Sequence, residues 1–143
     1  MSISELLRWQ HEGYPRYHRS RFNLLLHIVV VPLFLVANVA LVLALVERSW
    51  LVGIVSVAAM GVSVLLQGRG HRREAVPPEP FTGAVQAVAR IFLEQWVTFP
   101  RFVLSGGWWR ALRAVSLGGN RAYLLGPVAA CMLARQALRS RVT

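Results

Sequence analysis

The chain has no lysine, no aspartate and a single cysteine, Cys131. One cysteine cannot form a disulfide within the chain, and it falls short of the several thiolates that cysteine-based zinc sites use. Cys131 lies in an apolar stretch, which is typical of a small buried residue. The sequence also lacks a Gly-x-Ser-x-Gly motif, a phosphate-binding glycine loop and an RNA-binding module pattern. These absences argue against the hydrolases, P-loop proteins and RNA-binding modules that carry such motifs.

Charge of one sign dominates the chain. Its 16 basic residues are all arginine and its 6 acidic residues are all glutamate, which gives a formal net charge of +10. Basic proteins often bind nucleic acid, whereas arginines in membrane proteins mark cytoplasmic loops and anionic lipid surfaces. The arginines cluster beside two apolar runs: Arg8, Arg16, Arg19 and Arg21 precede the first run, and Arg69, Arg72 and Arg73 follow the second. This clustering favours a lipid bilayer over nucleic acid as the partner.

Two long apolar runs predict an antiparallel transmembrane hairpin. The chain is 55% hydrophobic with a mean hydropathy of +0.48, which is too apolar for an ordinary soluble domain of this size. Residues 22–46 contain no charged side chain, and about 20 such residues suffice to cross a bilayer. Residues 50–67 form the second predicted segment, after a tight turn at Glu47–Ser49. We therefore expect an all-α fold, a small helical membrane bundle forming one domain over residues 1–143.

The polar segments around the hairpin predict shorter elements. Residues 2–12 fit a short amphipathic helix, which Ser2 or Ser4 can cap and which Pro15 should interrupt. The first 20 residues are polar, and the apolar run that follows is too long for a secretory signal. Three prolines within residues 75–81 predict a loop.

The region after this loop is less apolar. Residues 82–104 carry Gln86, Arg90 and Glu94 at four-residue intervals, which places them on one stripe of a helix. Charges are costly at mid-bilayer, so an interfacial or re-entrant amphipathic helix is favoured over a spanning helix whose stripe faces the bundle. Residues 121–138 form a weaker apolar segment, which either spans the membrane or lies against the hairpin.

The arginine distribution predicts the orientation. Both open ends of the hairpin are rich in arginine and the closed end carries one, so the N-terminus and the region after residue 67 should be cytoplasmic. His18, His27 and His71 then lie at the same membrane face.

Three histidines and a carboxylate at one face suggest a metal site. Imidazole binds Fe(II), Zn(II) and Cu(II), and iron oxygenases keep open positions for substrate and oxygen. His27 lies about one turn inside the predicted membrane segment, where an ionisable residue is a functional candidate by default. Glu74 follows His71 by three residues and shares its face if the helix continues that far.

Each of these residues also has a structural interpretation. His27 can be a hydrogen-bonded polar residue, and His71 can be a solvated loop residue. Glu74 can pair with a nearby arginine, and Asn23 can cap the first membrane helix instead of orienting a ligand. His11 suits the surface, although a fourth ligand role is open to it. The expected convergence favours the site over these separate interpretations.

The residue pattern resembles a known family. The two motifs are Tyr17-His18-x-x-x-x-Asn23-x-x-x-His27-x-x-x-x-Pro32 and, after the apolar hairpin, Gln67-x-x-Gly70-His71-x-x-Glu74 followed by Pro77. Together they resemble the 2-hydroxy fatty acid dioxygenase-like family of small membrane proteins, over roughly residues 14–104. The stretch from Arg90 to Trp108 is similar to a bacterial branch, which implies an integral protein of the bacterial inner membrane.

The resemblance implies a specific chemistry. It implies an Fe(II)-dependent dioxygenase that shortens a 2-hydroxy fatty acid by one carbon, as in fatty acid alpha-oxidation. Its metal ligands would be His18, His27 and His71, with Glu74 and Asn23 as catalytic residues. The fatty-acid-like substrate would lie along the hairpin and the 82–104 helix, and an arginine (Arg19, Arg21 or Arg72) would neutralise its carboxylate.

Two other functions are consistent with the residues. A non-enzymatic membrane protein could bind lipid or a partner, with structural histidines and with arginines that hold anionic headgroups. A histidine pair could also ligate haem, although the cysteine motif for covalent haem attachment is absent.

Overall fold

The computed structural model describes the backbone of residues 2–124 and the side chains of residues 2–115. This part of the chain contains helices and no strand. The helices are α1 (Ile3–Tyr17), α2 (Arg21–Glu47), α3 (Trp50–His71), α4 (Ala84–Leu93), the π-helix η1 (Glu94–Thr98), α5 (Phe99–Leu104) and α6 (Gly107–Leu124). The chain divides into two compact units, residues 1–112 and 113–143, and the histidines all lie in the first unit. Cys131 and most of the predicted segment 121–138 lie outside the described residues.

Helix α1 is longer than its sequence predicts. Ser2 caps it with a reciprocal pair of bonds: the Ser2 side chain accepts from the Glu5 backbone, and the Glu5 carboxylate accepts from the Ser2 N–H at 2.7 Å. The expectation that Pro15 interrupts the helix is wrong, because the helix continues to Tyr17. Pro15 lies in the last turn, where its missing N–H removes one hydrogen bond and no further turn has to follow.

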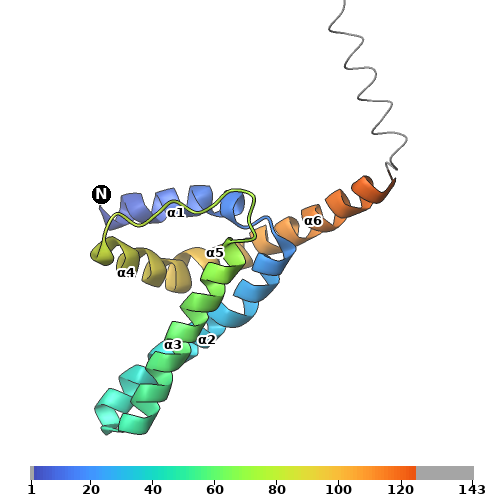
Figure 1. Ribbon diagram of the computed structural model, residues 1–143. Coiled ribbons are helices and arrows are strands. Elements are labelled where there is room, and N and C mark those ends of the chain that lie inside the picture. Colours follow the sequence, from blue (N-terminus) through green and yellow to red (C-terminus); the bar gives the residue numbers. More distant parts are fainter. Residues whose placement is uncertain (1, 125–143) are drawn as a thin grey trace, which may run out of the picture. The chain divides into compact units, whose positions relative to one another are not determined.

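Helices α2 and α3 form the predicted antiparallel hairpin and lie side by side (Figure 1). The turn between them places Arg48 in the left-handed conformation, with φ of 55°, and its N–H bonds to the Ala44 carbonyl. Both helices are long and apolar enough to cross a membrane, as the sequence predicts. Many of their apolar side chains, such as Leu45 and Leu51, are exposed in the isolated chain. Exposure on this scale is typical of a surface that contacts lipid or another protein.

Helix α3 extends one turn beyond its predicted end, through Gly68 and Gly70 to His71. Gly70 packs directly against the side chain of Asn23 on α2, where a Cβ atom would collide with the Asn23 amide oxygen. The glycine therefore permits a close approach of the two helices instead of ending the second one. The following residues 72–83 form the loop that the prolines predict.

The predicted single helix over residues 82–104 consists of three segments. Helix α4 ends at Leu93, η1 makes one π turn, and α5 continues the chain. The Phe99 N–H bonds to the Glu94 carbonyl, five residues back, and the next residue, Pro100, has no N–H to bond four residues back. Single π turns often occur at functional sites.

A small buried core joins α1, α2 and α5. Its members are Tyr14, Leu24, Val31, Phe99 and Phe102. Trp108 packs against this core and its indole N–H donates to the Leu24 carbonyl at 2.9 Å. Gly106, with φ of 73°, separates α5 from α6 just before Trp108. The core holds α1 and η1 against the N-terminal half of α2, which is where the histidines lie.

Candidate metal centre

Four side chains from four elements converge in the first unit. His18 follows α1, His27 lies on α2, His71 ends α3 and Glu94 begins η1. One ligand atom from each lies within 4.8 Å of the others. The sequence predicts the convergence of the three histidines, and the structure brings all three together. The fourth member is Glu94, which sequence analysis placed only on a polar stripe.

The three imidazole rings meet one another in T-shaped, edge-to-face contacts. Their centroids are 4.8 Å apart for His18 and His27, 4.9 Å for His18 and His71, and 5.0 Å for His27 and His71. The interplanar angles lie between 75° and 89°. The rings thus surround a common point and do not stack on one another.

Backbone carbonyls orient two of the rings. Nδ1 of His18 lies 3.0 Å from the Tyr14 carbonyl, and Nδ1 of His27 lies 3.0 Å from the Asn23 carbonyl. A carbonyl only accepts, so each Nδ1 carries the proton and each Nε2 presents a lone pair. Metal-binding histidines usually donate their second N–H to a carbonyl or carboxylate in this way.

The inward-facing nitrogens have no hydrogen-bond partner in the described structure. They are Nε2 of His18, Nε2 of His27 and Nδ1 of His71, and all three are buried. Buried polar atoms are rarely left unpaired, and each such atom calls for an explanation. A bound cation would use all three lone pairs, so this donor set fits a metal ion.

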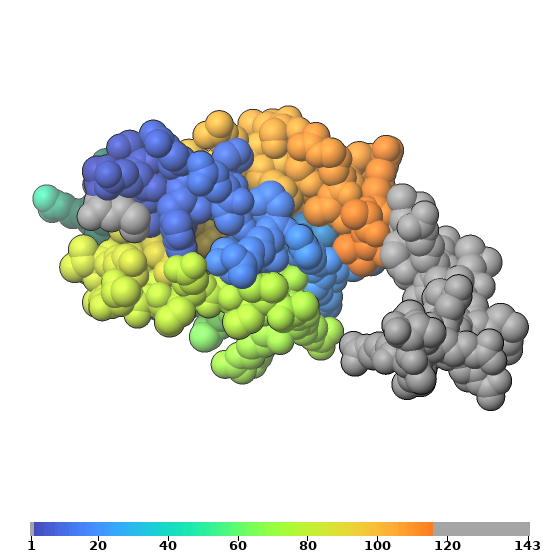
Figure 2. Space-filling model, turned by 90° about the horizontal axis from the view of Figure 1, so that it is seen from above, coloured from blue at the N-terminus to red at the C-terminus, as the bar shows by residue number. Residues whose placement is uncertain are grey.

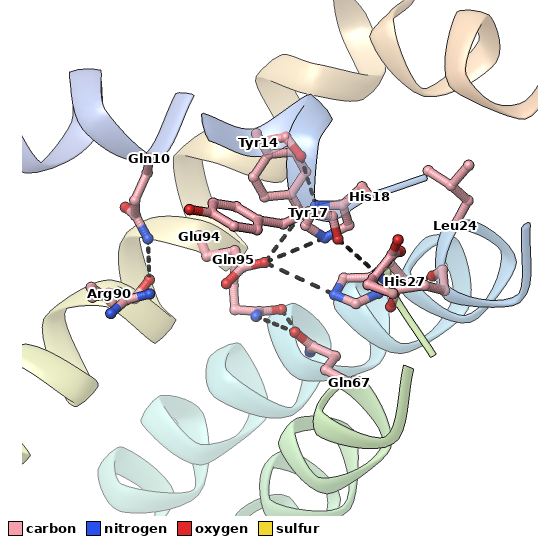
Figure 3. A network of polar contacts seen from close by, with 12 residues as sticks. Gln10, Tyr14, Tyr17, His18, Leu24, His27, Gln67, Arg90, Glu94 and Gln95 are labelled. Carbon is pink, nitrogen blue, oxygen red and sulfur yellow. Dashed lines mark hydrogen bonds and ion pairs between the residues drawn. The ribbon is translucent and has the colours of Figure 1, made fainter. Parts of the chain in front are cut away.

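Glu94 supplies an oxygen to the same point. Its Oε1 atom lies 3.9 Å from Nε2 of both His18 and His27 and accepts a hydrogen bond from the Tyr14 hydroxyl at 3.1 Å (Figure 3). Burial raises the pKa of Glu94 to about 7, although the Tyr14 hydrogen bond and the charge of Arg90 oppose this shift. The carboxylate therefore lacks a full counter-charge, and a cation at the centre would provide one.

Burial also affects the two residues beside Glu94. It lowers the pKa of His18 well below its ordinary value, and the neighbouring His27 and His71 lower it further. Burial and the adjacent Glu94 raise the pKa of the Tyr14 hydroxyl. His18 is consequently a neutral imidazole, which is the form that binds metals, and Tyr14 stays protonated as a donor to Glu94.

The types of ligand atom limit which metal ions the site suits. Three imidazole nitrogens and one carboxylate suit Fe, Zn, Cu or Ni, and four ligands leave two positions open on a six-coordinate ion. Haem ligation by a histidine pair suits the arrangement poorly, because the third imidazole and Glu94 lie where the macrocycle would have to fit.

Glu74 and Asn23 lie beside the cluster and contribute no side-chain atom to it. Both Glu74 oxygens accept hydrogen bonds, from the backbone N–H groups of Arg19 and Ser20 and from the Asn23 amide at 2.7 Å. Helix α3 ends before Glu74, which turns its carboxylate toward the positive N-terminus of α2. Ser20, and not Asn23, caps α2. Asn23 acts on the cluster through its carbonyl, which holds His27.

The remaining predicted residues lie around the site. Arg19, Arg21 and Arg72 are exposed, and His11 on α1 is outside the four-residue cluster. Of the three arginines, Arg72 lines a cavity of about 330 Å³ that reaches the cluster at His71 and Glu94.

This cavity is mostly apolar. Its walls come from the C-terminal half of α3, the proline loop and α4–η1, and its lining includes Val64, Gln67, Phe81, Ile91 and Gln95. Arg90 closes one side: its guanidinium lies over the rings of Trp9 and Phe81 and donates to the carbonyls of Glu79 and Pro80. These contacts hold α1 against the loop and α4, which are adjacent in Figure 2.

Comparisons with protein-family models, with curated proteins and with solved structures found no match to this chain.

Proposed function

We propose that this protein is a membrane-bound Fe(II)-dependent dioxygenase that shortens a 2-hydroxy fatty acid by one carbon. The observation that carries the proposal is the group of three buried, unpartnered imidazole nitrogens facing one carboxylate. His18, His27, His71 and Glu94 would hold the iron. The proposal replaces Glu74 with Glu94 as the carboxylate of the site.

Iron in such a site supplies the electron transfer and dioxygen chemistry that no side chain of this protein provides. The simplest balanced reaction converts one 2-hydroxy acid and one dioxygen into the acid one carbon shorter, carbon dioxide and water. The bond between the first and second carbons breaks, and four electrons pass from the substrate to dioxygen.

The chain's own residues would prepare the site for this reaction. The carbonyls of Tyr14 and Asn23 fix the tautomers of His18 and His27, and the Tyr14 hydroxyl holds one oxygen of Glu94. These contacts keep the four donors oriented before any ligand arrives, which lowers the cost of ordering them.

The cavity beside His71 and Glu94 is the proposed substrate site. Its apolar walls suit an acyl chain, and Arg72 at its edge suits a carboxylate. Within the described residues the Arg72 guanidinium has no ion-pair partner. Arg19 and Arg21 do not line this cavity, so Arg72 is the arginine that we assign to the substrate.

We place the hairpin of α2 and α3 across a bacterial inner membrane, with the N-terminus and the metal centre at the cytoplasmic side. Support comes from the length and apolarity of both helices and from the arginines at the open end of the hairpin. The exposed side chains of Val85 and Val88 on α4 would contact the membrane interface.

The first test measures metal in protein purified anaerobically in detergent. We expect about one iron per chain in the wild type and none in a variant with His18, His27 and His71 changed to alanine. The matched control is His11→Ala, which removes a histidine of α1 outside the cluster and should leave the iron content unchanged. Absence of metal after Fe(II) reconstitution, or full retention by the triple variant, would reject the site.

The second test concerns the reaction. The iron-loaded protein is incubated with 2-hydroxy fatty acids of several lengths, while oxygen uptake and the chain-shortened acid are measured together. We expect both in equal amounts, and neither with the unsubstituted fatty acid. Stoichiometric iron with no oxygen uptake would leave the metal site standing and reject the dioxygenase activity. Absence of both would favour the lipid-binding alternative, in which exposed arginines such as Arg69, Arg72 and Arg73 contact headgroups.

A further inference from the structure

A buried amide pair lies next to the metal centre. Gln67 on α3 and Gln95 on η1 bond reciprocally: the Gln95 amide donates to Gln67 Oε1 at 2.7 Å, and the Gln67 amide donates to Gln95 Oε1 at 3.1 Å (Figure 3). Only 5% of Gln67 and 1% of Gln95 are exposed. Each amide thus satisfies the other in a place that water hardly reaches.

The pair continues into a ladder that reaches α2. The Gln67 amide also donates to Ser63 Oγ at 3.1 Å, and the Ser63 hydroxyl donates to the Val30 carbonyl at 2.6 Å. Ser63 is fully buried. Four residues from α3, η1 and α2 therefore form one connected set of hydrogen bonds.

This ladder joins the elements that carry three of the four proposed ligands. Gln67 lies one helical turn before His71, and Gln95 directly follows Glu94. Val30 lies about one turn after His27. The ladder is therefore one turn away from the ligands on α2 and α3 and one residue away from the carboxylate.

Glu94 needs such a restraint more than the histidines do. His18 and His27 are held by backbone carbonyls, whereas the only hydrogen bond of the Glu94 carboxylate among the described residues comes from Tyr14. Its side chain is 20% exposed, and it belongs to a π turn, which is a less regular support than an α-helix. Fixing Gln95 limits the rotation of η1 about its axis and so limits where Glu94 can point.

We infer that Gln67 and Gln95 are positioning residues that hold Glu94 toward the three histidines. The inference rests on the proposed metal site, and it goes beyond it by assigning a function to residues that bind no metal themselves. Replacing an outer-shell partner of a metal ligand typically weakens metal binding by about 10- to 100-fold. We expect a loss of this size when the pair is removed.

The experiment uses Co(II) as the probe, because its visible spectrum reports the ligand set directly. Affinity and spectrum are measured for the full chain in detergent, for Gln67→Leu, for Gln95→Leu and for the double variant. Glu94→Gln serves as the reference for a lost carboxylate. Gln86→Leu is the matched control, since the Gln86 side chain accepts from the Thr82 N–H just before α4 and makes no other hydrogen bond among the described residues.

A positioning role and a structural role give different results in the double variant. Each single variant leaves one buried amide unpaired, so both should lower the thermal stability of the metal-free protein. The double variant removes both amides and should recover much of that stability. If the pair positions Glu94, Co(II) affinity stays about 10- to 100-fold below wild type in the double variant, and its spectrum approaches that of Glu94→Gln.

Two results would overturn the inference, and they differ from each other. A double variant with wild-type Co(II) affinity and spectrum shows that the pair only supports the fold. If the wild-type protein binds neither Co(II) nor Fe(II), the proposed metal site is rejected, and the inference fails with it. If the double variant does not fold, Gln95→Asn replaces it: this change keeps the amide but shortens it, and it should weaken Co(II) binding to a smaller extent.

Discussion

Nε2 of His27 and Oε1 of Glu94 lie 3.9 Å apart, too far for a hydrogen bond and close enough to share one metal ion. The same oxygen lies 3.9 Å from Nε2 of His18. Glu94 faces the lone pairs of two buried imidazoles and bonds neither, which is the arrangement expected of ligands around a common ion.

Glu94→Gln should abolish or strongly weaken iron binding. The amide is a poorer ligand than a carboxylate and brings no negative charge to offset the cation. We expect a loss of at least 10-fold in affinity, with the helical fold retained, measured by elemental analysis and by Fe(II) titration. Unchanged affinity would mean that the three histidines bind metal without the carboxylate.

Glu74→Gln should give the opposite result. The Glu74 oxygens accept hydrogen bonds from two backbone N–H groups and from the Asn23 amide. A glutamine at this position would place its own NH₂ group, a donor, opposite one of these donors. We expect a loss of about 1–3 kcal/mol in the free energy of unfolding and normal iron content. Thermal unfolding and metal analysis of the same preparation check both parts. Loss of iron with unchanged stability would return Glu74 to the metal site.

Two glycines two residues apart on α3, Gly68 and Gly70, offer a matched pair of variants. A Cβ at Gly70 would collide with Asn23, whereas a Cβ at Gly68 would meet no atom within 4 Å. Gly70→Ala should therefore destabilise the protein by about 1–3 kcal/mol, because the two helices must move apart. Gly68→Ala should be neutral or stabilise it by up to about 1 kcal/mol, because alanine favours the helix. The midpoint of thermal unfolding distinguishes the two, and equal midpoints would contradict the close approach.

The histidine cluster can be predicted from the sequence because the prediction needs only the positions of two apolar runs and the short turn between them. Two apolar runs joined by a short turn must be antiparallel, so His27 and His71, at matching depths, come to the same end of the hairpin. Ser20 and Pro15 affect only where α1 and α2 begin and end, and errors there leave the cluster intact.

The presence of Glu94 in the cluster could not be predicted, because residue spacing alone does not show which segments pack together. Glu94 reaches the histidines because α4 packs beside α1, where the buried Gln10 amide donates to the Arg90 carbonyl, and because the chain then makes a π turn that begins at Glu94. Glu74 is closer to His71 in the sequence, but the end of α3 at His71 turns it toward Arg19 and Ser20. Closeness to His71 in the sequence favoured Glu74, whereas tertiary packing brings Glu94 to the cluster.

Arg72 should act on substrate binding and not on the metal. Arg72→Gln removes the positive charge at the edge of the cavity, so we expect the KM for a 2-hydroxy fatty acid to rise by about 10-fold with little change in kcat. Arg69→Gln is the matched control, because it makes the same change three residues earlier, in the last turn of α3, at a residue that does not line the cavity. Iron content should be normal in both. Equal KM values for the two variants would exclude Arg72 from the substrate site.

The proposed orientation can be tested with single cysteines in a Cys131→Ser background. Glu47→Cys lies at the closed end of the hairpin and Arg72→Cys follows α3 at the open end, and both positions are exposed. With the N-terminus in the cytoplasm, a membrane-impermeant maleimide should label position 47 from outside in spheroplasts and position 72 only after lysis. The reversed pattern would place the metal centre on the outer face. Labelling of both positions from outside would show that the hairpin does not cross the membrane, and α2 and α3 would then have to bury their apolar surfaces against a protein partner.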